Sequence, residues 1–548
     1  MKLLLINSIK ADIDSKTNIG INFQNYDIND PSNRKISYSN SFTLPITENN
    51  NVIFGFAKDA QSFGMEVYDK LNIEYWQDNE KLIEGKCIIT EISDRIKLTI
   101  FQKNEFWDEL KAYTYTEFIT DFLAWLNTEK NVPIFTDQFA GTLQDLMDIY
   151  ANNTEGIIIP YMFGNLFMQD DGSGAFVEDE DNIHVWYQGG NGGHVCCFVK
   201  TIFEFLEEKF DVDFNLNTTD AGNIWNDVYA PNIYIPLRRL AIDFAGPGES
   251  NFFFKITVIS TAPSLISYPP YNILDYAEKT MYDFLKSFIQ LFNLVVLEDN
   301  SLTKLSISMK RFDDILTYGK VVKFSGKIDL RKTVFKPSFS GIAQINKIKY
   351  GVKFEGATED EGDLLITSEN KNLEPKKELF DFDSYYPNVI INSDNESIIN
   401  LSTEESFETF TFLISAGLSY TTKFVKFFTF TATLKLRIAQ LYSITGEYNL
   451  LKTIYEYPKF YTIEKWLTIN DVIALDFYKI YYIKELRGGF FINKISGFNP
   501  DDNKKPTKID LIKVGETPPL PIGESYDVDV FVDGNGNPFV DGSNNFFI

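Results

Sequence analysis

The sequence is poor in cysteine and histidine, the residues that form disulfides and that serve in many metal sites and catalytic sites. Its 548 residues include three cysteines and two histidines. Three cysteines cannot form a disulfide framework, so we expect a fold that does not need an oxidising compartment. With two histidines, neither a Ser-His-Asp nor a Cys-His catalytic arrangement is well supported. These shortages favour a structural or binding protein over an enzyme.

Cationic residues are outnumbered as well. The chain has 51 lysines and arginines against 77 aspartates and glutamates, which gives a formal net charge of −26. Binding to nucleic acid or to an anionic membrane surface depends on clustered cations. We therefore expect neither kind of binding.

Long apolar runs are missing too. No stretch approaches the roughly 18 consecutive apolar residues that suggest a transmembrane helix. The apolar run that begins at Leu3 stops after four residues, short of the roughly 7–15 in the core of a signal peptide. We therefore expect a soluble chain without a membrane anchor, folded in a cytoplasm.

Aromatic residues, by contrast, are abundant, at 15% of the chain with 49 Phe and 29 Tyr. Aromatic side chains favour the half-buried surfaces of β-sheets, so the predicted fold class is α+β, predominantly β. The length suggests about three to five domains. Shifts in composition divide the chain into a β-rich segment 1–104, mixed α+β segments 105–250 and 251–400, a β-rich segment 401–514, and a proline linker with a C-terminal β-arm at 515–548.

Hydrophobic periodicity predicts the individual elements. Alternation and β-branched content predict strands at 71–76, 86–90, 96–101, 252–260, 294–297, 304–309, 407–414, 423–436, 472–475, 478–485, 489–495 and 508–512. Helical spacing predicts helices at 59–68, 115–125, 143–150 and 199–210. The clearest helix has its apolar stripe at 281–292; we predict Asp275 as its N-cap, with Glu278 in a capping-box-like position, and Asn293 as its end.

Both histidines lie near two cysteines in the sequence, as His184, His194, Cys196 and Cys197. A zinc site is one hypothesis, but adjacent cysteines rarely chelate one tetrahedral ion. We interpret these residues instead as a loop that leads into a buried segment. The stretch 170–193 also holds consecutive carboxylates and a glycine run without the Lys-Ser/Thr of a phosphate-binding loop. We predict that it is an exposed loop with no bound metal.

The end of the chain contains two Phe-Val-Asp-Gly units, which begin at Phe531 and Phe539. A calcium loop is the alternative, but Pro538 stands where such a loop needs glycine. We therefore interpret the units as short strands joined by tight turns. An arm this small cannot bury its own phenylalanines, so we predict that Phe531, Phe539, Phe546 and Phe547 dock on another subunit or a neighbouring protein.

Three further stretches occur in an order that matches a known family. They are the Ser-x-x-Phe-x-Leu-Pro-x-Thr-x-x-Asn block at 39–50, the helix and hairpin at 279–297 with the similar residues 311–314 and 327–330 after them, and the closing strands 490–495 and 505–513. Together they resemble the tail hub, or baseplate hub, proteins of tailed bacteriophages, in the divergent form found in phages and prophages of Bacteroides-like hosts. None of the three is a catalytic motif.

The resemblance implies a non-enzymatic virion protein that forms a ring at the end of the tail tube and lets DNA pass without specific binding. Related hubs pair two β-barrel-like tube domains and carry peripheral insertions; here 1–104 and part of 251–514 are the candidates. A homotrimer is expected, with a hexamer as the alternative, together with neighbouring tail proteins as partners. The expected location is the virion tail, after assembly in the host cytoplasm. An acidic lumen would repel the phosphates of passing DNA.

Two other function classes stay open. One is a receptor-binding or carbohydrate-binding adhesin of the tail, with its aromatic residues as sugar platforms. The other is a cell-wall hydrolase, for which the sequence offers no nucleophile with a base and an orienting group. We predict no catalytic residues, no metal and no cofactor.

Overall fold

The structure is a computed structural model and shows a predominantly β, α+β chain, as the composition predicts. It describes residues 2–24, 26–33, 37–58, 70–102, 105–129, 139–141, 157–158, 162–163, 194–226, 233–244, 254–258, 279–299, 304–324, 326–338, 341–353, 363–386, 388–391, 397–400, 413–414, 448–501 and 505–514. None of the described helices combines the length and apolarity needed to cross a membrane.

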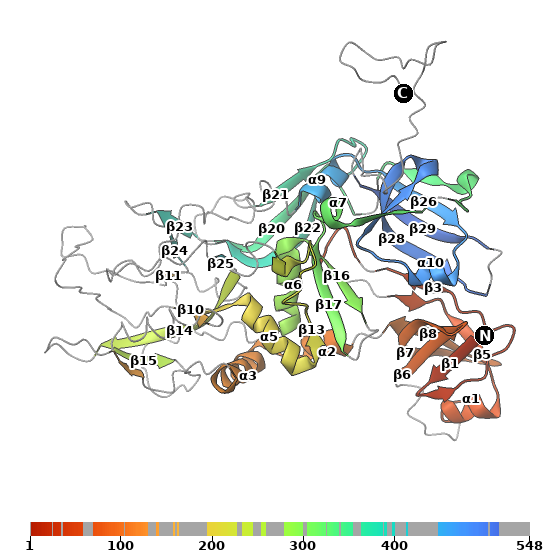
Figure 1. The fold of residues 1–548 in the computed structure, drawn as a ribbon, viewed down its shortest axis with the longest axis horizontal. Coiled ribbons are helices and arrows are strands. Elements are labelled where there is room, and N and C mark those ends of the chain that lie inside the picture. The colour runs from red at the N-terminus through yellow and green to blue at the C-terminus, as the bar shows by residue number, and fades with distance from the viewer. Residues whose placement is uncertain are drawn as a thin grey trace, which may run out of the picture.

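Strands from both ends of the chain form one 14-stranded sheet (Figure 1). The N-terminal strands are β1 (Lys2–Ile6), β2 (Ile9–Lys10), β3 (Ile21–Phe23), β4 (Tyr38–Ser39), β5 (Phe42–Pro45), β6 (Leu71–Gln77), β7 (Glu80–Ile92) and β8 (Arg95–Gln102). The later strands are β18 (Lys320–Lys323), β19 (Val334–Lys336), β26 (Phe460–Lys465), β27 (Lys479–Ile483), β28 (Gly488–Phe498) and β29 (Thr507–Lys513).

The strand order of this sheet is β19-β26-β29-β28-β3-β4-β8-β7-β6-β1-β2, with β5 paired to β8, β27 to β28 and β18 to β27. The two groups of strands therefore meet where β3 pairs with β28. Whether the sheet closes into the barrel-like units expected from the sequence stays a prediction, as do the domain boundaries.

Alternating burial explains why these segments are strands. In β6 the side chains of Leu71, Ile73 and Tyr75 are buried, whereas Asn72 and Glu74 between them are more exposed. This pattern places one face of the sheet on a core and the other toward solvent. The core under the sheet takes side chains from both ends of the chain, from Leu4 and Leu98 to Ile495 and Leu511.

A second core lies beside the sheet and is rich in helices (Figure 1). Its main helices are α2 (Glu105–Ala112), α3 (Tyr115–Thr128), α5 (Val199–Phe210), α6 (Met281–Phe292) and α9 (Asn449–Glu456). Aromatic rings fill the space between α3 and α5, where Phe205 packs edge-on against Phe118 and Phe122. At the rim of this contact the Trp125 indole donates to Glu208 at 2.8 Å.

Smaller sheets flank these helices. One joins β13 (Val212–Asp213), β17 (Leu305–Arg311) and β16 (Leu294–Asp299), and another joins β21 (Leu364–Thr367), β20 (Ile345–Lys353) and β22 (Lys376–Tyr386). A third joins β11 (Met162–Phe163), β24 (Ser397–Asn400) and β23 (Asn388–Ile391). A six-stranded sheet holds β10 (Ile157–Ile158), β12 (His194–Phe198), β14 (Ile233–Phe244), β15 (Phe254–Val258), β9 (Phe139–Gly141) and β25 (Leu413–Ile414). The short helices are α1 (Glu48–Ile53), α7 (Ile315–Tyr318), α10 (Ile469–Ile473) and the 3₁₀ turns η2 (Ile224–Asn226), η5 (Leu330–Lys332) and η9 (Lys484–Leu486).

The sequence predicts the middle and the end of α6 correctly but not its start. The helix begins after Thr280, whose hydroxyl accepts from the Asp283 N–H while the Asp283 carboxylate accepts from the Thr280 N–H. This reciprocal pair satisfies two N-terminal donors, so the helix starts there and not at Asp275. Asn293 ends the helix in the left-handed region, at φ 50°, as expected of a C-terminal Asn.

The strand predicted at 472–475 is wrong, because its first half belongs to α10 and the rest is not in a strand. Thr468 and Asp471 form a capping box at the start of this helix, and that local signal outweighs a short apolar run. Several other predicted elements lie outside the described residues, namely the helices at 59–68 and 143–150, the strand at 423–436 and the C-terminal arm at 515–548.

Candidate functional site at the seam of the sheet

The two ends of the chain meet along one short line of pairing, between β3 and β28. Ile21 lies opposite Phe498 and Phe23 lies opposite Ile495, with an irregularity in β28 between these two positions. The rings of Phe23 and Phe498 lie 6.3 Å apart. We call the β3–β28 pairing and the residues around it the seam.

A buried amide holds the seam together. Asn22 is 4% exposed; its side-chain oxygen accepts from the Gly497 N–H at 2.9 Å, and its NH₂ group donates to the Asn40 oxygen at 3.0 Å. Gly497 has φ 68°, a conformation that favours glycine. A Cβ at Gly20 would lie 2.9 Å from the Asn40 amide, so glycine lets that amide approach the backbone. The seam thus depends on small residues and amide hydrogen bonds.

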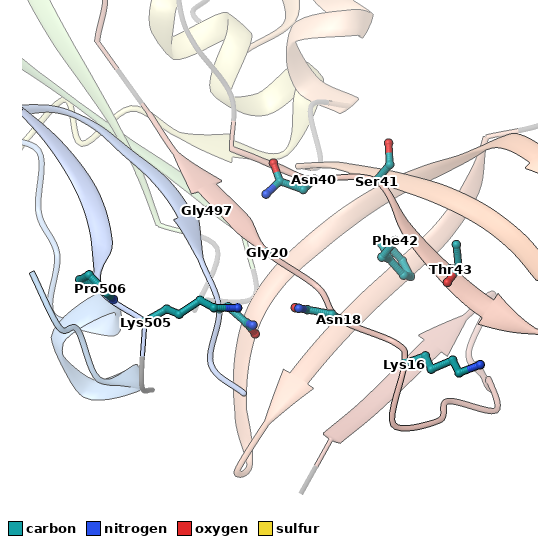
Figure 2. Close-up of a pocket in the computed structure, with 11 residues that line it drawn as sticks. Lys16, Asn18, Gly20, Asn40, Ser41, Phe42, Thr43, Gly497, Lys505 and Pro506 are labelled. Carbon is teal, nitrogen blue, oxygen red and sulfur yellow. The ribbon is translucent and has the colours of Figure 1, made fainter. Parts of the chain in front are cut away.

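A polar cavity of about 480 Å³ opens at the seam. Figure 2 shows residues of the N-terminal strands on one side of it and Gly497, Lys505 and Pro506 on the other. Its lining is Lys16, Asn18, Gly20, Asn40, Ser41, Phe42, Thr43, Gly497, Asn499, Lys505 and Pro506. Two lysines and no carboxylate line it, so it suits neutral polar or anionic groups. None of these residues pairs a nucleophile with a base.

From the seam the chain enters the helical core through a tyrosine-rich hydrogen-bond network. The Tyr26 hydroxyl donates to Asn293 at 2.7 Å, and the Tyr455 hydroxyl donates to the Ile28 carbonyl at 3.1 Å. Burial raises the pKa of both hydroxyls well above the usual range. They therefore act as neutral donors, and they tie residues 26–29 to α6 and α9.

Asp313 caps α9 from a distance. Its carboxylate accepts from the N–H of Asn449, the first residue of the helix, at 2.5 Å. Tyr448 occupies the usual capping position but has no short side-chain acceptor to cap the helix, and its hydroxyl donates to the Gln290 carbonyl. The pKa of Asp313 is raised to about 7, chiefly by burial and to a smaller extent by the neighbouring charge of Asp314. The N–H groups of α9 and Arg311 act in the opposite direction.

This raised pKa predicts a pH-dependent stability. The unfolded carboxyl titrates near 3.8, so the stabilisation from protonating the folded form is complete below that value and is lost as the pH rises through about 7. We expect the free energy of unfolding to fall by about 2 kcal/mol between roughly pH 5.5 and pH 8 on account of this group. Asp313→Asn keeps an acceptor for α9 and should remove that part of the slope, as measured by urea denaturation.

Glu207 allows a second test of the same kind. Burial also raises its pKa to about 7, and it accepts from the Phe214 N–H at 2.6 Å. Glu207→Gln should remove a second, separate part of the slope, while repulsion among the other acidic groups stays equal in all variants. Equal slopes in wild type and Asp313→Asn would contradict the assignment to Asp313.

The residues singled out from the sequence do not gather at the seam. His194 lies in β12. Cys197 is buried in the helical core, and its thiol donates to the Phe198 carbonyl. This agrees with the interpretation of Cys197 as part of a buried segment that precedes α5. Burial raises the pKa of Cys197, and raises that of Cys87 to about 12, so both thiols are unreactive. Within the part of the chain that the structure describes, no cluster of three or more metal-ligating side chains occurs.

The other predicted site residues lie outside the described residues. These are His184, the loop at 170–193 and the docking phenylalanines Phe531, Phe539, Phe546 and Phe547. Sequence reasoning missed Asn22, Asn40 and Gly497, because isolated small polar residues carry no periodic signal. The block 39–50 did draw attention to the neighbourhood of Asn40.

No protein-family model and no curated protein matches the chain. Among solved structures, the chain is similar to the 43 kDa tail protein of prophage MuSo2 from Shewanella oneidensis, at 10% identity and a TM-score of 0.33, over 93% of this chain and 98% of that one. It is also similar to the prophage tail protein gp18 from Listeria monocytogenes, at 8% identity and a TM-score of 0.31, over 94% and 95% of the two chains. Likeness this distant does not by itself define a fold or a function.

Proposed function

We propose that this chain is a structural protein of a phage tail, and more narrowly a hub that forms a ring at the end of the tail tube. The observation that carries the proposal is the seam. The family resemblance implies two tube-like β domains side by side, and here strands from 2–102 and from 320–513 share one sheet and one core.

The charge of the chain agrees with this role. A tube through which DNA passes works best when its wall does not bind phosphate, and an excess of acidic residues repels it. In this proposal the hub joins the tube to distal tail or receptor-binding proteins and has no enzymatic activity. The C-terminal phenylalanines dock on an adjacent subunit or tail protein.

The adhesin alternative gains no support from the seam cavity. Sugar platforms need an exposed aromatic face, and the one aromatic residue in the lining, Phe42, is 3% exposed. Sugar-dependent binding of the purified protein would favour that alternative over the hub.

The test is the oligomeric state of the purified full-length chain. We expect light scattering and negative-stain images to show a closed ring, a trimer first and a hexamer as the alternative. Chains that stay monomeric at every concentration, and in the presence of other tail proteins, would contradict the proposal.

Deletion of 518–548 gives a second prediction. We expect the truncated chain to keep its melting temperature nearly unchanged and to assemble less well, because a proline-rich linker precedes an arm too small to bury its own phenylalanines. Circular dichroism melting and light scattering measure the two effects. If the truncated chain unfolds, the arm belongs to its own core and the docking proposal fails.

A further inference from the structure

One end of the large sheet is an exposed strand with apolar side chains. β19 pairs with β26 on one side, and among the described residues no strand pairs with its outer side. Val334 is 47% exposed and Phe335 is 51% exposed. An unprotected strand of this kind presents backbone N–H and C=O groups to a further strand.

The sequence segment that contains β19 is basic, whereas the chain as a whole is acidic. Residues 320–336 contain six cations and one carboxylate, whereas the whole chain carries a net charge of −26. Lys336 is the last residue of the strand, and Lys332, which pairs with Glu464 of β26 at 2.7 Å, lies just before it; both lysines are exposed. A basic, apolar strand edge suits an acidic, apolar partner strand.

The C-terminal part of the chain supplies such a strand. Residues 526–533 read Tyr-Asp-Val-Asp-Val-Phe-Val-Asp, which puts Asp527 and Asp529 on one face of an extended strand and Val528 and Val530 on the other. Residues 515–548 contain six carboxylates and no lysine or arginine. We propose that residues 526–533 of one copy add as a strand to the β19 edge of a neighbouring copy.

The faces of the two strands match in this arrangement. Lys336 and Val334 lie on one face of β19, and Phe335 lies on the other, where its ring packs 5.1 Å from that of Tyr461. The aspartates of the added strand meet the lysine face, and the valines extend the apolar surface of Phe335. Cross-strand pairs of these two kinds stabilise sheets.

The geometry of the chain favours a neighbouring copy over the same copy. Ile512 pairs with Phe460 and Phe460 pairs with Lys336, so the chain leaves the sheet about 10 Å from its own β19, two strands away. The eleven residues 515–525 include three prolines, and such a linker spans about 30 Å when extended. A semi-rigid spacer of that length suits an adjacent subunit better than a return over 10 Å. This inference rests on the proposed ring.

Zero-length cross-linking of the full-length protein tests the contact directly. A carbodiimide joins a lysine amine to a carboxylate only where the two touch, and mass spectrometry locates the link. We expect links from Lys336 to Asp527 or Asp529. In a mixture of ¹⁵N-labelled and unlabelled chains these links should join one labelled and one unlabelled peptide.

Charge reversal gives a matched set of variants. Lys336→Glu, and separately Asp527→Lys with Asp529→Lys, should each lower the yield of assembled rings about tenfold, and combining them should recover it to within about threefold of wild type. Lys371→Glu, the same change at a lysine that is 72% exposed elsewhere, should have no effect. Melting curves confirm that each variant is folded.

The outcomes separate this inference from the proposed function. Three results would each overturn the inference but not the proposed ring. They are rings without mixed-isotope links at Lys336, links confined to one isotope, and a Lys336→Glu variant that assembles as well as Lys371→Glu. The absence of any ring would overturn the proposed function itself.

Discussion

Replacing Phe491 by alanine should lower the free energy of unfolding by about 3–5 kcal/mol. The ring is fully buried, and it packs edge-on against Tyr26 at 5.8 Å and Phe312 at 5.3 Å. Phe491 belongs to strand β28, Tyr26 to the segment after β3, and Phe312 directly follows β17. The cavity left by alanine therefore opens where the sheet, the N-terminal segment and the helical core meet.

Urea denaturation measures this effect, and Phe335→Ala is the matched control. Phe335 is 51% exposed, so the same change of side chain there should alter stability by less than about 0.5–1 kcal/mol. We expect one cooperative transition that shifts as a whole in Phe491→Ala. A loss of less than about 1 kcal/mol would show that the ring is not packed as described.

The second large effect concerns a buried ion pair in the sheet of β20–β22. The Lys347 amine lies 2.9 Å from the Asp363 carboxylate, and the two side chains are 4% and 0% exposed. Asp363 also accepts from the Tyr350 N–H at 3.2 Å. Asp363→Ala would leave a buried lysine without its counter-charge, so we expect a loss of about 3–5 kcal/mol.

Two variants distinguish this from a general effect of mutating the sheet. Lys347→Met with Asp363→Leu replaces the pair by apolar groups and should recover most of the loss. Lys349→Met removes an exposed pair with Glu378 from the same strand and should cost less than about 1 kcal/mol. If the double variant is as unstable as Asp363→Ala, packing and not the unpaired charge is the cause.

The sequence alone predicts the regular elements well where the periodicity is strong. β6, β8, β29 and α5 lie where alternation or helical spacing puts them. These elements can be predicted from the sequence because their buried side chains recur with the period of a strand or a helix.

The seam could not be predicted in the same way. Asn22 and Gly497 bond to each other but lie 475 residues apart, and neither has a periodic neighbourhood. The start of α6 fails for a related reason. Thr280-x-x-Asp283 and Asp275-x-x-Glu278 offer two similar caps, and the choice between them depends on tertiary contacts: the Met281 N–H donates to the Tyr113 carbonyl.

The seam also sets an order of events during synthesis. β3 pairs with β4 on one side, but its partner on the other side, β28, is made only about 475 residues later. At about 5–20 residues per second, that wait lasts roughly 20–100 s. During that time one side of β3 is an uncovered edge, open to pairing with other nascent chains. A ribosome that stops before β28 therefore releases a chain prone to aggregate, and a slow, late closing step is expected when the full chain refolds.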